Sequence, residues 1–416
     1  MLLLMTVGTG IGTDHEDSIK RLVESCSYAI HSYHPDDVIF FCTKESQEIL
    51  PLIIKEYAKK NGSAILKNSN CLISDPSDFT CCFELIFEVA SLYSEEEIII
   101  EASTGTREMI MAAEIVSFLN RIPVSHVTGD KINGIIISGS ERNKQMVLYA
   151  AYDRLQFHRA IDAFNLSQFG SSLRLISNAV SIPDRDIYYG IFNGYWYWDR
   201  MNYAEAYRYL EHAPDINIQI GLNRQFLREL IYLDQLDDSG LDRKKMLKIR
   251  QKKYVYVLID LLHNARRRVD GEHYDDALAR LYRVVELISQ VLLLNYGIDD
   301  NEEKIRFSDL KKILKRQDLS LYARRADRHG VVRIGLRSKF YLLEDLGLKG
   351  AGNWYSELQQ YIMARNDSIL AHGITPVQGE MVRVMWDNVR NIIKEACSEI
   401  NEDLEVLYSS SDFPVL

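Results

Sequence analysis

The sequence predicts two structural classes in one chain: an N-terminal α/β domain with a mostly parallel, doubly wound sheet, followed by an all-α remainder. Three observations support this prediction. Short apolar runs alternate with amphipathic segments of helical period over the first 150 residues. No comparable strand pattern follows in the rest of the chain. The length of 416 residues is too great for one ordinary core, so two or three domains are expected.

The N-terminal elements follow from the alternation of two hydrophobic periods. Each apolar run is short and rich in β-branched residues, and each amphipathic run repeats its apolar residues with a period near 3.6. Three consecutive isoleucines at 98–100 suit a strand that is covered on both faces. The expected strands are 2–8, 36–43, 95–102, 122–129 and 134–140, and the expected helices are 17–33, 46–62 and 106–120.

The remainder of the chain shows helical periodicity only. The amphipathic patterns cover 152–177, 189–213, 250–297 and 353–409. No segment recurs at a fixed period, so a repeat array is not expected. The sequence DDSGLDRKK at 237–245 is typical of a joint. The expected domains are an α/β domain at 1–150, a helical middle region at 151–245 and a C-terminal helical domain at 246–416.

Composition and charge restrict the classes of function. No apolar run approaches the roughly 20 residues of a membrane helix. The start MLLLMTVG lacks the basic residues of a signal peptide, so we expect a cytoplasmic protein with no membrane partner. Six cysteines without CxxC spacing fit free thiols in a reducing compartment, and neither a zinc cluster nor a disulfide framework is expected.

The net charge of −10 argues against general binding of nucleic acid, so any contact with a polyanion must be local. Basic residues nevertheless cluster in two places. Seven lysines and arginines fall within 243–253, and a second basic segment runs over 311–333. These segments are either solvated helix faces or local contacts for a polyanion, and charge patterning does not decide between the two.

Two loops that combine glycine with hydroxyl residues each follow a predicted strand and precede a predicted helix. They read TVGTGIGTD at 6–14 and STGTRE at 103–108. Loops at the carboxyl ends of parallel strands converge on a crevice where ligands bind. Glycine allows close approach of the backbone, and helix N-termini attract phosphates. The candidate ligand-binding residues are Gly8, Thr9, Gly10, Ser103, Thr104, Gly105, Thr106 and Arg107. The threonines would offer hydroxyl donors, and Arg107 a positive charge.

Other interpretations of these loops stay open. Ser103 or Thr104 can simply cap the following helix while Gly105 forms the turn. A dinucleotide site is disfavoured, because the glycines in 8–12 recur at every second residue and do not form G-x-G-x-x-G. In addition, no acidic residue ends the second predicted strand, as such a site requires.

A second candidate site lies near the C-terminus. The pattern from Trp354 predicts one helix that continues to Gly373. One face of that helix would carry Leu358, Ile362, Arg365, Ile369 and His372. Arg365 and His372 would then lie on an apolar stripe, which is costly unless they are paired or used, so they serve either structure or catalysis. No carboxylate–histidine cluster has metal-ligand spacing, so a metal-dependent nuclease is not expected.

The order of these sites resembles that of the CARF–HEPN ribonucleases of type III CRISPR systems. In that family, a Rossmann-like CARF domain carries two such loops, which here read VGTGIG and STGTREM. The C-terminal HEPN domain carries an R-x(4–6)-H motif, which here is RNDSILAH at 365–372. An earlier helical segment at 274–292 also matches in character. The resemblance spans nearly the whole chain.

The resemblance implies a ribonuclease of antiviral defence that is activated allosterically by a cyclic oligoadenylate. The two loops would bind cyclic tetra- or hexa-adenylate, and a symmetric homodimer would supply each loop twice. Some family members also cleave the ring slowly in this pocket, a reaction that Thr9, Thr104 and Thr106 would position. The resemblance implies no cofactor.

At the HEPN site the resemblance implies metal-independent endonucleolytic cleavage of single-stranded RNA, with 2′,3′-cyclic phosphate products and no DNA substrate. His372 would act as general acid or base, Arg365 would stabilise the phosphorane charge, and Asn366 would orient the 2′-hydroxyl or the arginine. A spacing of roughly 10 Å along one helix would require two protomers to form a composite cleft. The alternatives are a non-catalytic sensor of cyclic nucleotides and, less favoured, a dinucleotide-dependent Rossmann enzyme.

Overall fold

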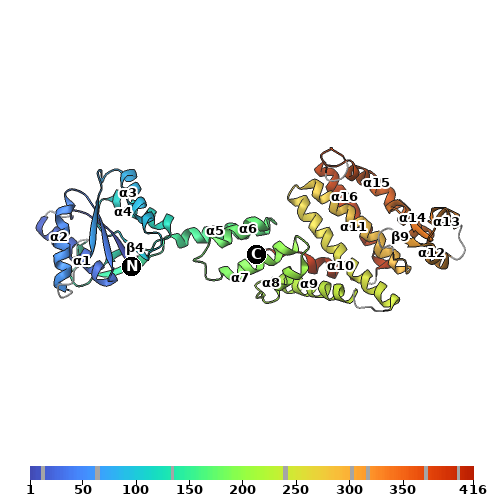
Figure 1. The fold of residues 1–416 in the computed structure, drawn as a ribbon, viewed down its shortest axis with the longest axis horizontal. Helices are drawn as coiled ribbons and strands as arrows, with labels where there is room; N and C mark the ends of the chain where they lie inside the picture. The colour runs from blue at the N-terminus through green and yellow to red at the C-terminus, as the bar shows by residue number, and fades with distance from the viewer. Residues whose placement is uncertain are drawn as a thin grey trace. The chain divides into compact units, whose positions relative to one another are not determined.

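The chain folds into two compact units, shown in Figure 1. A computed structural model describes residues 1–10, 15–60, 66–132, 135–237, 242–299, 304–314, 319–369, 373–400 and 403–416. The first unit comprises Met1–Phe157 and Ala179–Ile182, and the second comprises His158–Asn178 and Pro183–Leu416.

The first unit contains a six-stranded sheet with the order β3-β2-β1-β4-β5-β8. All neighbouring strands are parallel except β5 and β8, which are antiparallel. The predicted mostly parallel, doubly wound sheet is therefore confirmed. The strands are β1 (Leu2–Val7), β2 (Asp37–Cys42), β3 (Asn68–Leu72), β4 (Ile98–Glu101), β5 (Val124–Thr128) and β8 (Arg142–Met146).

Helices cover both faces of this sheet (Figure 1). They are α1 (His15–Tyr33), the 3-10 turn η1 (Ser46–Ile49), α2 (Leu50–Lys60), α3 (Phe79–Leu92) and α4 (Arg107–Asn120). Successive strand residues point to opposite faces. Leu3 and Met5 of β1 accordingly pack with α1 and α2, whereas Leu2 and Leu4 pack with α3 and α4. Burial on both faces explains why the central strands are apolar throughout.

Parts of the first unit differ from the elements expected from the sequence. β3 and α3 have no counterpart among the expected elements. The apolar pattern does not reveal β3, because this strand is polar and largely exposed at the sheet edge. The expected strand at 134–140 is wrong in extent. A two-residue strand, β7 (Ile135–Ile136), pairs instead with β6 (Lys131–Ile132). The antiparallel edge strand β8 follows it.

The second unit is helical, as the sequence predicts. Its helices begin with α5 (Tyr149–Asn165), which starts in the first unit, and continue with α6 (Phe169–Ser177), α7 (Arg185–Trp198), α8 (Tyr203–Leu210), α9 (Ile218–Asp237), α10 (Arg243–Asp270), α11 (Tyr274–Asn295), α12 (Phe307–Ile313), α13 (Ser320–Arg325), α14 (Leu336–Asp345), α15 (Ala351–Asn366), α16 (Gly379–Glu395), η3 (Ala396–Glu399) and α17 (Leu404–Ser411). The sequence predicted only helices in this part of the chain. The structure adds a short antiparallel pair, β9 (Lys304–Arg306) and β10 (Val331–Arg333).

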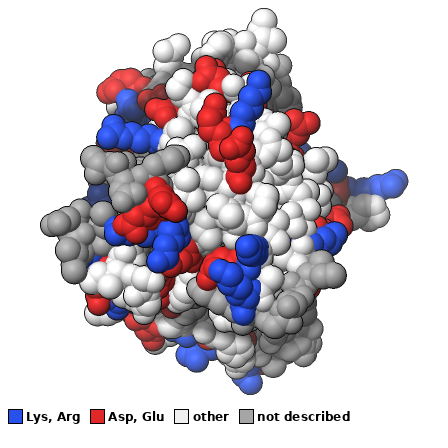
Figure 2. All heavy atoms as spheres, turned by 90° about the vertical axis from the view of Figure 1, so that its left-hand side faces the viewer, with Lys and Arg blue, Asp and Glu red and all other residues white. Residues whose placement is uncertain are grey.

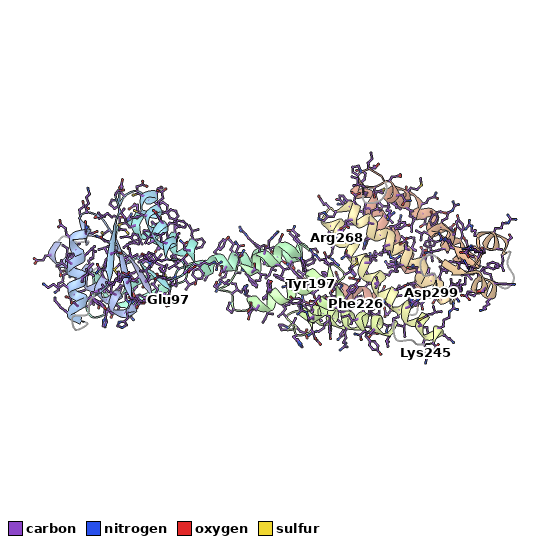
Figure 3. The ribbon with its side chains drawn as sticks, viewed as in Figure 1. Glu97, Tyr197, Phe226, Lys245, Arg268 and Asp299 are labelled. Atoms are coloured by element: carbon purple, nitrogen blue, oxygen red, sulfur yellow. The ribbon has the colours of Figure 1, made fainter. Side chains whose placement is uncertain are left out.

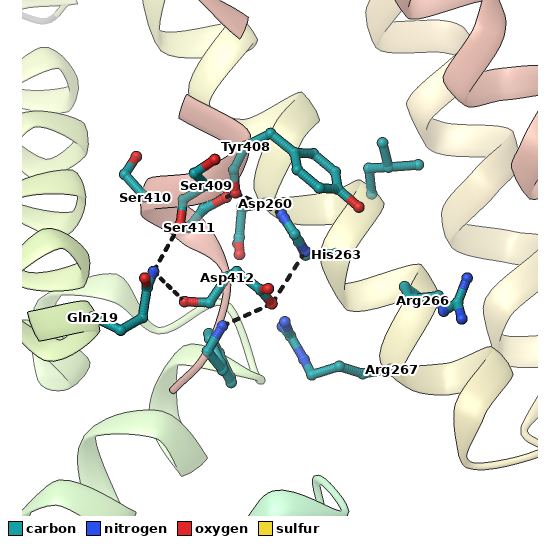
Figure 4. A network of polar contacts seen from close by, with 12 residues as sticks. Gln219, Asp260, His263, Arg266, Arg267, Tyr408, Ser409, Ser410, Ser411 and Asp412 are labelled. Atoms are coloured by element: carbon teal, nitrogen blue, oxygen red, sulfur yellow. Dashed lines mark hydrogen bonds and ion pairs between the residues drawn. The ribbon is translucent and has the colours of Figure 1, made fainter. Parts of the chain in front are cut away.

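The C-terminal segment is held by side chains of the preceding helices (Figure 4). Gln219 of α9 donates to the carbonyl oxygens of Ser409 at 2.7 Å and Asp412 at 2.8 Å. His263 of α10 donates its Nε2–H to the carbonyl oxygen of Tyr408 at 2.8 Å. Burial lowers the pKa of His263 to about 4, so the ring stays neutral at pH 7. These contacts fix α17 against α9 and α10.

A buried ion network joins the middle helices to α10 and α11. Asp199, which follows α7, accepts a hydrogen bond from Arg267 Nε at 3.0 Å. It also pairs with Arg268, which is labelled in Figure 3. Arg268 in turn pairs with Asp276 of α11 at 3.3 Å. The side chain of Asp199 is only 5% exposed, so these charges depend on one another for their solvation.

Removal of Asp199 should destabilise the second unit strongly. The Asp199→Ala variant leaves Arg267 and Arg268 without this carboxylate, and loss of one partner of a buried ion pair costs about 3–5 kcal/mol. The control is Asp270→Ala, which removes the exposed partner of Arg266 and should cost less than about 1 kcal/mol. Urea unfolding followed by circular dichroism measures both free energies, and equal losses would contradict the role given to Asp199.

Candidate functional site

The loops after β1 and β4 meet where the strand order of the sheet reverses. β1 lies between β2 and β4, and open α/β sheets bind ligands at such a switch point. The two loops are in backbone contact, because a Cβ atom on Gly8 would lie 2.8 Å from the nitrogen of Gly105. Any side chain at Gly8 would therefore separate the loops.

Reciprocal hydrogen bonds hold the loops together. The Thr104 hydroxyl donates to the carbonyl oxygen of Thr6 at 2.7 Å, and the Thr6 hydroxyl donates to the carbonyl oxygen of Thr104. Gly105 lies between Thr104 and the start of α4. Its φ of +125° is rarely adopted by a residue with a Cβ atom. The STGT turn, defined here as residues 103–106, is thus shaped by contacts with the first loop.

The residue that caps α4 is Thr106. Its hydroxyl oxygen accepts the Met109 N–H at 3.2 Å, and its hydroxyl proton is donated to the carbonyl oxygen of Pro76 at 2.6 Å. The alternative in which Ser103 or Thr104 caps this helix is therefore wrong. The Thr104 and Thr106 hydroxyl protons are already donated within the chain, so the expectation that they are free donors is also wrong.

The loops line a cavity of about 920 Å³ in the first unit. All eight candidate ligand-binding residues line it: Gly8, Thr9, Gly10, Ser103, Thr104, Gly105, Thr106 and Arg107. Sequence reasoning missed two cations of the lining, Arg21 of α1 and Lys131 of β6. Neither belongs to a motif, and only the fold brings them to the loops. Their charges suit an anionic ligand, although Arg21 also pairs with Asp17.

On the face of the molecule that Figure 2 shows, positive charge does not form the continuous patch that a non-specific polyanion site would require. On the face shown in Figure 2, lysine and arginine side chains are intermingled with aspartate and glutamate around a broad uncharged area. This agrees with the net charge of −10 and with a contact to anions that is confined to the cavity.

A buried carboxylate that the sequence analysis did not single out lies next to the STGT turn. Glu101, the last residue of β4, is 2% exposed. Its Oε1 accepts the Ser103 N–H at 3.1 Å and also the Ser103 hydroxyl proton. The Ser103 oxygen in turn accepts the Val127 N–H at 2.5 Å. Burial raises the pKa of Glu101 to about 7.

The second candidate site does not have the expected helical geometry. α15 ends at Asn366, so the prediction of one helix up to Gly373 is wrong. The chain folds back after the helix, because the Gly373 N–H donates to the carbonyl oxygen of Ser368 at 3.1 Å. The predicted spacing along one helix therefore does not apply to the R-x(6)-H motif.

The expected apolar stripe ends with the helix. Leu358 and Ile362 are buried, but Ile369 is 58% exposed. Arg365 is half-buried in the last turn of α15, and Asn366 is exposed. Residues 370–372, which include the predicted catalytic residue His372, lie outside the described residues.

Two neighbours orient the Arg365 guanidinium. Its central carbon lies 4.5 Å from the centre of the Tyr282 ring on α11, a cation–π distance. Its Nη1 donates to Asn366 Oδ1 at 3.2 Å. The guanidinium is thus held by an aromatic face and an amide. Among the described residues it has no carboxylate partner, so its charge is available to an anion.

The basic cluster at 243–253 is largely paired with acidic residues. Lys245, which is labelled in Figure 3, is one of five cations of this cluster that pair with an acidic residue among the described parts of the chain. The pairs are Arg243–Asp309, Lys245–Asp242, Arg250–Asp299, Lys252–Glu229 and Lys253–Asp234. This pairing favours the structural interpretation of the cluster over a role in guiding RNA.

Within the described ranges, no group of three or more histidine, cysteine, aspartate or glutamate residues is arranged to hold a metal ion. In the same part of the chain, no helix is long and apolar enough to cross a membrane.

The fold and the sites define a class: an α/β domain with an anion-suited cavity, followed by a helical unit with an R-x(6)-H motif. The family model of the Csm6 HEPN domain matches residues 246–398, and that of the Csm6 6H domain matches residues 152–238. Together they match more than half of the chain. The chain belongs to the Csm6 family of CARF–HEPN proteins.

A solved structure of the same family name shares this fold. Csm6 from Enterococcus italicus, bound to cyclic hexa-2′-fluoro-hexa-dAMP, is 14% identical and superposes with a TM-score of 0.62 over 99% of this chain and 98% of that one. Can2 from Sulfobacillus thermosulfidooxidans, in complex with cyclic tetra-adenylate, is 12% identical over 49% of this chain and 66% of that one. Its TM-score of 0.25 is too low to support a conclusion. No curated protein matches the chain.

Proposed function

We propose that this protein is an endoribonuclease of type III CRISPR antiviral defence that a cyclic oligoadenylate activates. One observation carries the proposal: in a chain of the Csm6 family, all eight loop residues line one cavity at the switch point of the sheet. The cyclic hexa-2′-fluoro-hexa-dAMP bound to the Enterococcus italicus relative supports a ring of six nucleotides as the ligand, and cyclic tetra-adenylate is the second ring to test. The proposed domains are the CARF domain at 1–150, the middle region at 151–245 and the HEPN domain at 246–416.

The ring would bind through its phosphates and the loop backbones. Gly8 and Gly10 expose backbone without side chains, and the start of α4 directs its partial positive charge toward the cavity lining. Slow cleavage of the ring in this cavity stays a prediction. The hydroxyl protons of Thr104 and Thr106 are donated elsewhere, so Thr9 is the first residue to test for it.

The RNA chemistry would take place at the R-x(6)-H motif. The 2′-hydroxyl of single-stranded RNA attacks the adjacent phosphorus, and a 2′,3′-cyclic phosphate forms as the 5′-oxygen leaves. Arg365, oriented by Tyr282 and Asn366, stabilises the negative charge that develops on the phosphoryl oxygens. His372 moves the proton. The mechanism requires no metal ion.

Cleavage of a fluorescent single-stranded RNA by the purified protein, with and without cyclic tetra- and hexa-adenylate, tests the proposal. Ring-dependent cleavage that persists in EDTA and yields 2′,3′-cyclic phosphate ends is expected. Ring binding without cleavage would favour the non-catalytic sensor, and binding of NAD in place of the rings would favour a dinucleotide enzyme.

The protein should be a homodimer, because a ring with rotational symmetry suits two copies of each loop. An apolar stripe on α4 supports this: Met111, Ile115 and Leu119 are spaced by four residues and are 44%, 36% and 54% exposed. Light scattering should show a dimer that Leu119→Asp shifts to monomer. The control Leu52→Asp, on α2 at the other face of the sheet, should stay dimeric. A wild-type monomer at all concentrations would contradict the prediction.

A further inference from the structure

Glu101 connects the sheet to the ligand cavity. It pairs in register with Met5 of β1 and Ser125 of β5, and both of its contacts with Ser103 reach the STGT turn. Ser103 and Val127, which are linked by a hydrogen bond, both line the cavity. The conformation of the turn therefore depends directly on this carboxyl group.

The environment of Glu101 disfavours its negative charge. The second oxygen, Oε2, is buried and has no partner within hydrogen-bond distance. The nearby Ser125 hydroxyl and Val127 N–H favour the charged form, but burial outweighs them and raises the pKa of the carboxyl. Among the described residues, no lysine, arginine or histidine lies within ion-pair distance of it. A buried carboxylate without a cation binds a proton more readily than an exposed one. Its protonation state near pH 7 is thus sensitive to any further charge in the cavity.

The other groups that face Glu101 do not titrate in the same range. From α1 it is faced by the Cys26 thiol, whose pKa burial raises to about 12, and by Tyr33, whose pKa is also raised by burial. Tyr33 donates its hydroxyl proton to Ser125 Oγ at 2.9 Å. His126 belongs to the opposite face of β5, where it pairs with Glu114 at 3.2 Å.

We propose that Glu101 is a positioning residue of the STGT turn that takes up a proton when the cyclic oligoadenylate binds. This inference rests on the proposed function, since it needs an anionic ring in the cavity. The phosphates of the ring would repel an ionised Glu101, so the ring binds the protonated form more tightly. The neutral carboxyl still accepts both Ser103 donors through Oε1 and gains a proton on the orphaned Oε2.

The sign of the pH dependence follows from linkage. Below about pH 7, Glu101 is already protonated in the free protein, so ring affinity should be nearly constant. Above that pH, binding must draw a proton from solution, and affinity should fall by up to about tenfold per pH unit for each linked proton. The Glu101→Gln variant has no proton to take up, so its affinity should be flat over the same range.

Calorimetry with the full-length protein tests this between pH 6 and 9. Cyclic tetra- and hexa-adenylate are titrated in phosphate and in Tris, whose different ionisation enthalpies reveal the number of protons bound. Above about pH 7 the wild type should take up protons, and Glu101→Gln should not; below that pH neither protein should. The control Glu88→Gln removes an exposed carboxylate of α3 that lies outside the cavity lining, and it should keep the wild-type uptake.

The outcomes separate the inference from the proposed function. If a ring binds the wild type without proton uptake, or if Glu101→Gln takes up as many protons as the wild type, the inference is wrong and the proposed function stands. If neither ring binds the wild type at any pH, both are wrong. Should Glu101→Gln fail to fold, Glu101→Asp keeps a carboxyl group there and should retain the uptake, and its loss would overturn the inference.

Discussion

Arg365→Ala should reduce ring-activated RNA cleavage by at least about 10²-fold, because it removes a charge from the place where the transition state becomes negative. His372→Ala should reduce it by about 10² to 10⁴, the usual contribution of a positioned acid or base. Ring binding should be unchanged in both variants, since the loops of the cavity belong to the other unit. Single-turnover cleavage and calorimetry measure the two effects separately.

A matched control for this experiment is Arg337→Ala. Arg337 is an exposed arginine of the second unit, and its guanidinium carbon lies 5.5 Å from the centre of the Tyr341 ring. Its loss removes the same type of contact without touching the motif, so cleavage should stay near the wild-type rate. If Arg365→Ala or His372→Ala cuts RNA as fast as the wild type, the motif has a structural role and the proposed chemistry is wrong.

Gly105→Leu should abolish ring binding. A residue with a Cβ atom is strained at the φ of +125° that Gly105 adopts, at a cost of about 1–3 kcal/mol, and the new Cβ would lie 3.3 Å from that of Met109. If the free turn relaxes to another shape, binding must restore the strained one, and this alone would lower affinity by about tenfold or more. The leucine side chain would in addition occupy part of the cavity lining. Calorimetry with cyclic tetra- and hexa-adenylate measures the loss.

The control for Gly105→Leu is a glycine with a similar backbone in the same unit. Gly139 has a φ of +89°, and nothing lies within 4 Å of its expected Cβ. Gly139→Leu should carry a comparable backbone strain yet bind the ring, because this residue does not line the cavity. A Gly105→Leu protein that binds the ring as tightly as the wild type would contradict the assignment of the cavity.

Several features of this protein were determined by the sequence alone. The period of two in the strands and 3.6 in the helices is a local property, so it predicted the α/β domain and the helical remainder. Chain order then placed the loops at 6–14 and 103–108 at the carboxyl ends of strands, where the sheet brings them together. The sequence also located the R-x(6)-H motif, because a motif is read without knowledge of its surroundings.

Only the tertiary structure decided the contacts between residues that are distant in the chain. Thr106 caps α4 while its hydroxyl proton goes to Pro76, and the Thr104 proton goes to Thr6, so these two expected donors are already used. The basic cluster at 243–253 finds acidic partners as far away as Asp309. α15 stops at Asn366, where the chain folds back and ends the apolar stripe. The burial of Glu101 is also a result of tertiary packing. Its desolvation depends on how α1, β1 and β5 pack around it, and the local sequence pattern does not predict this packing.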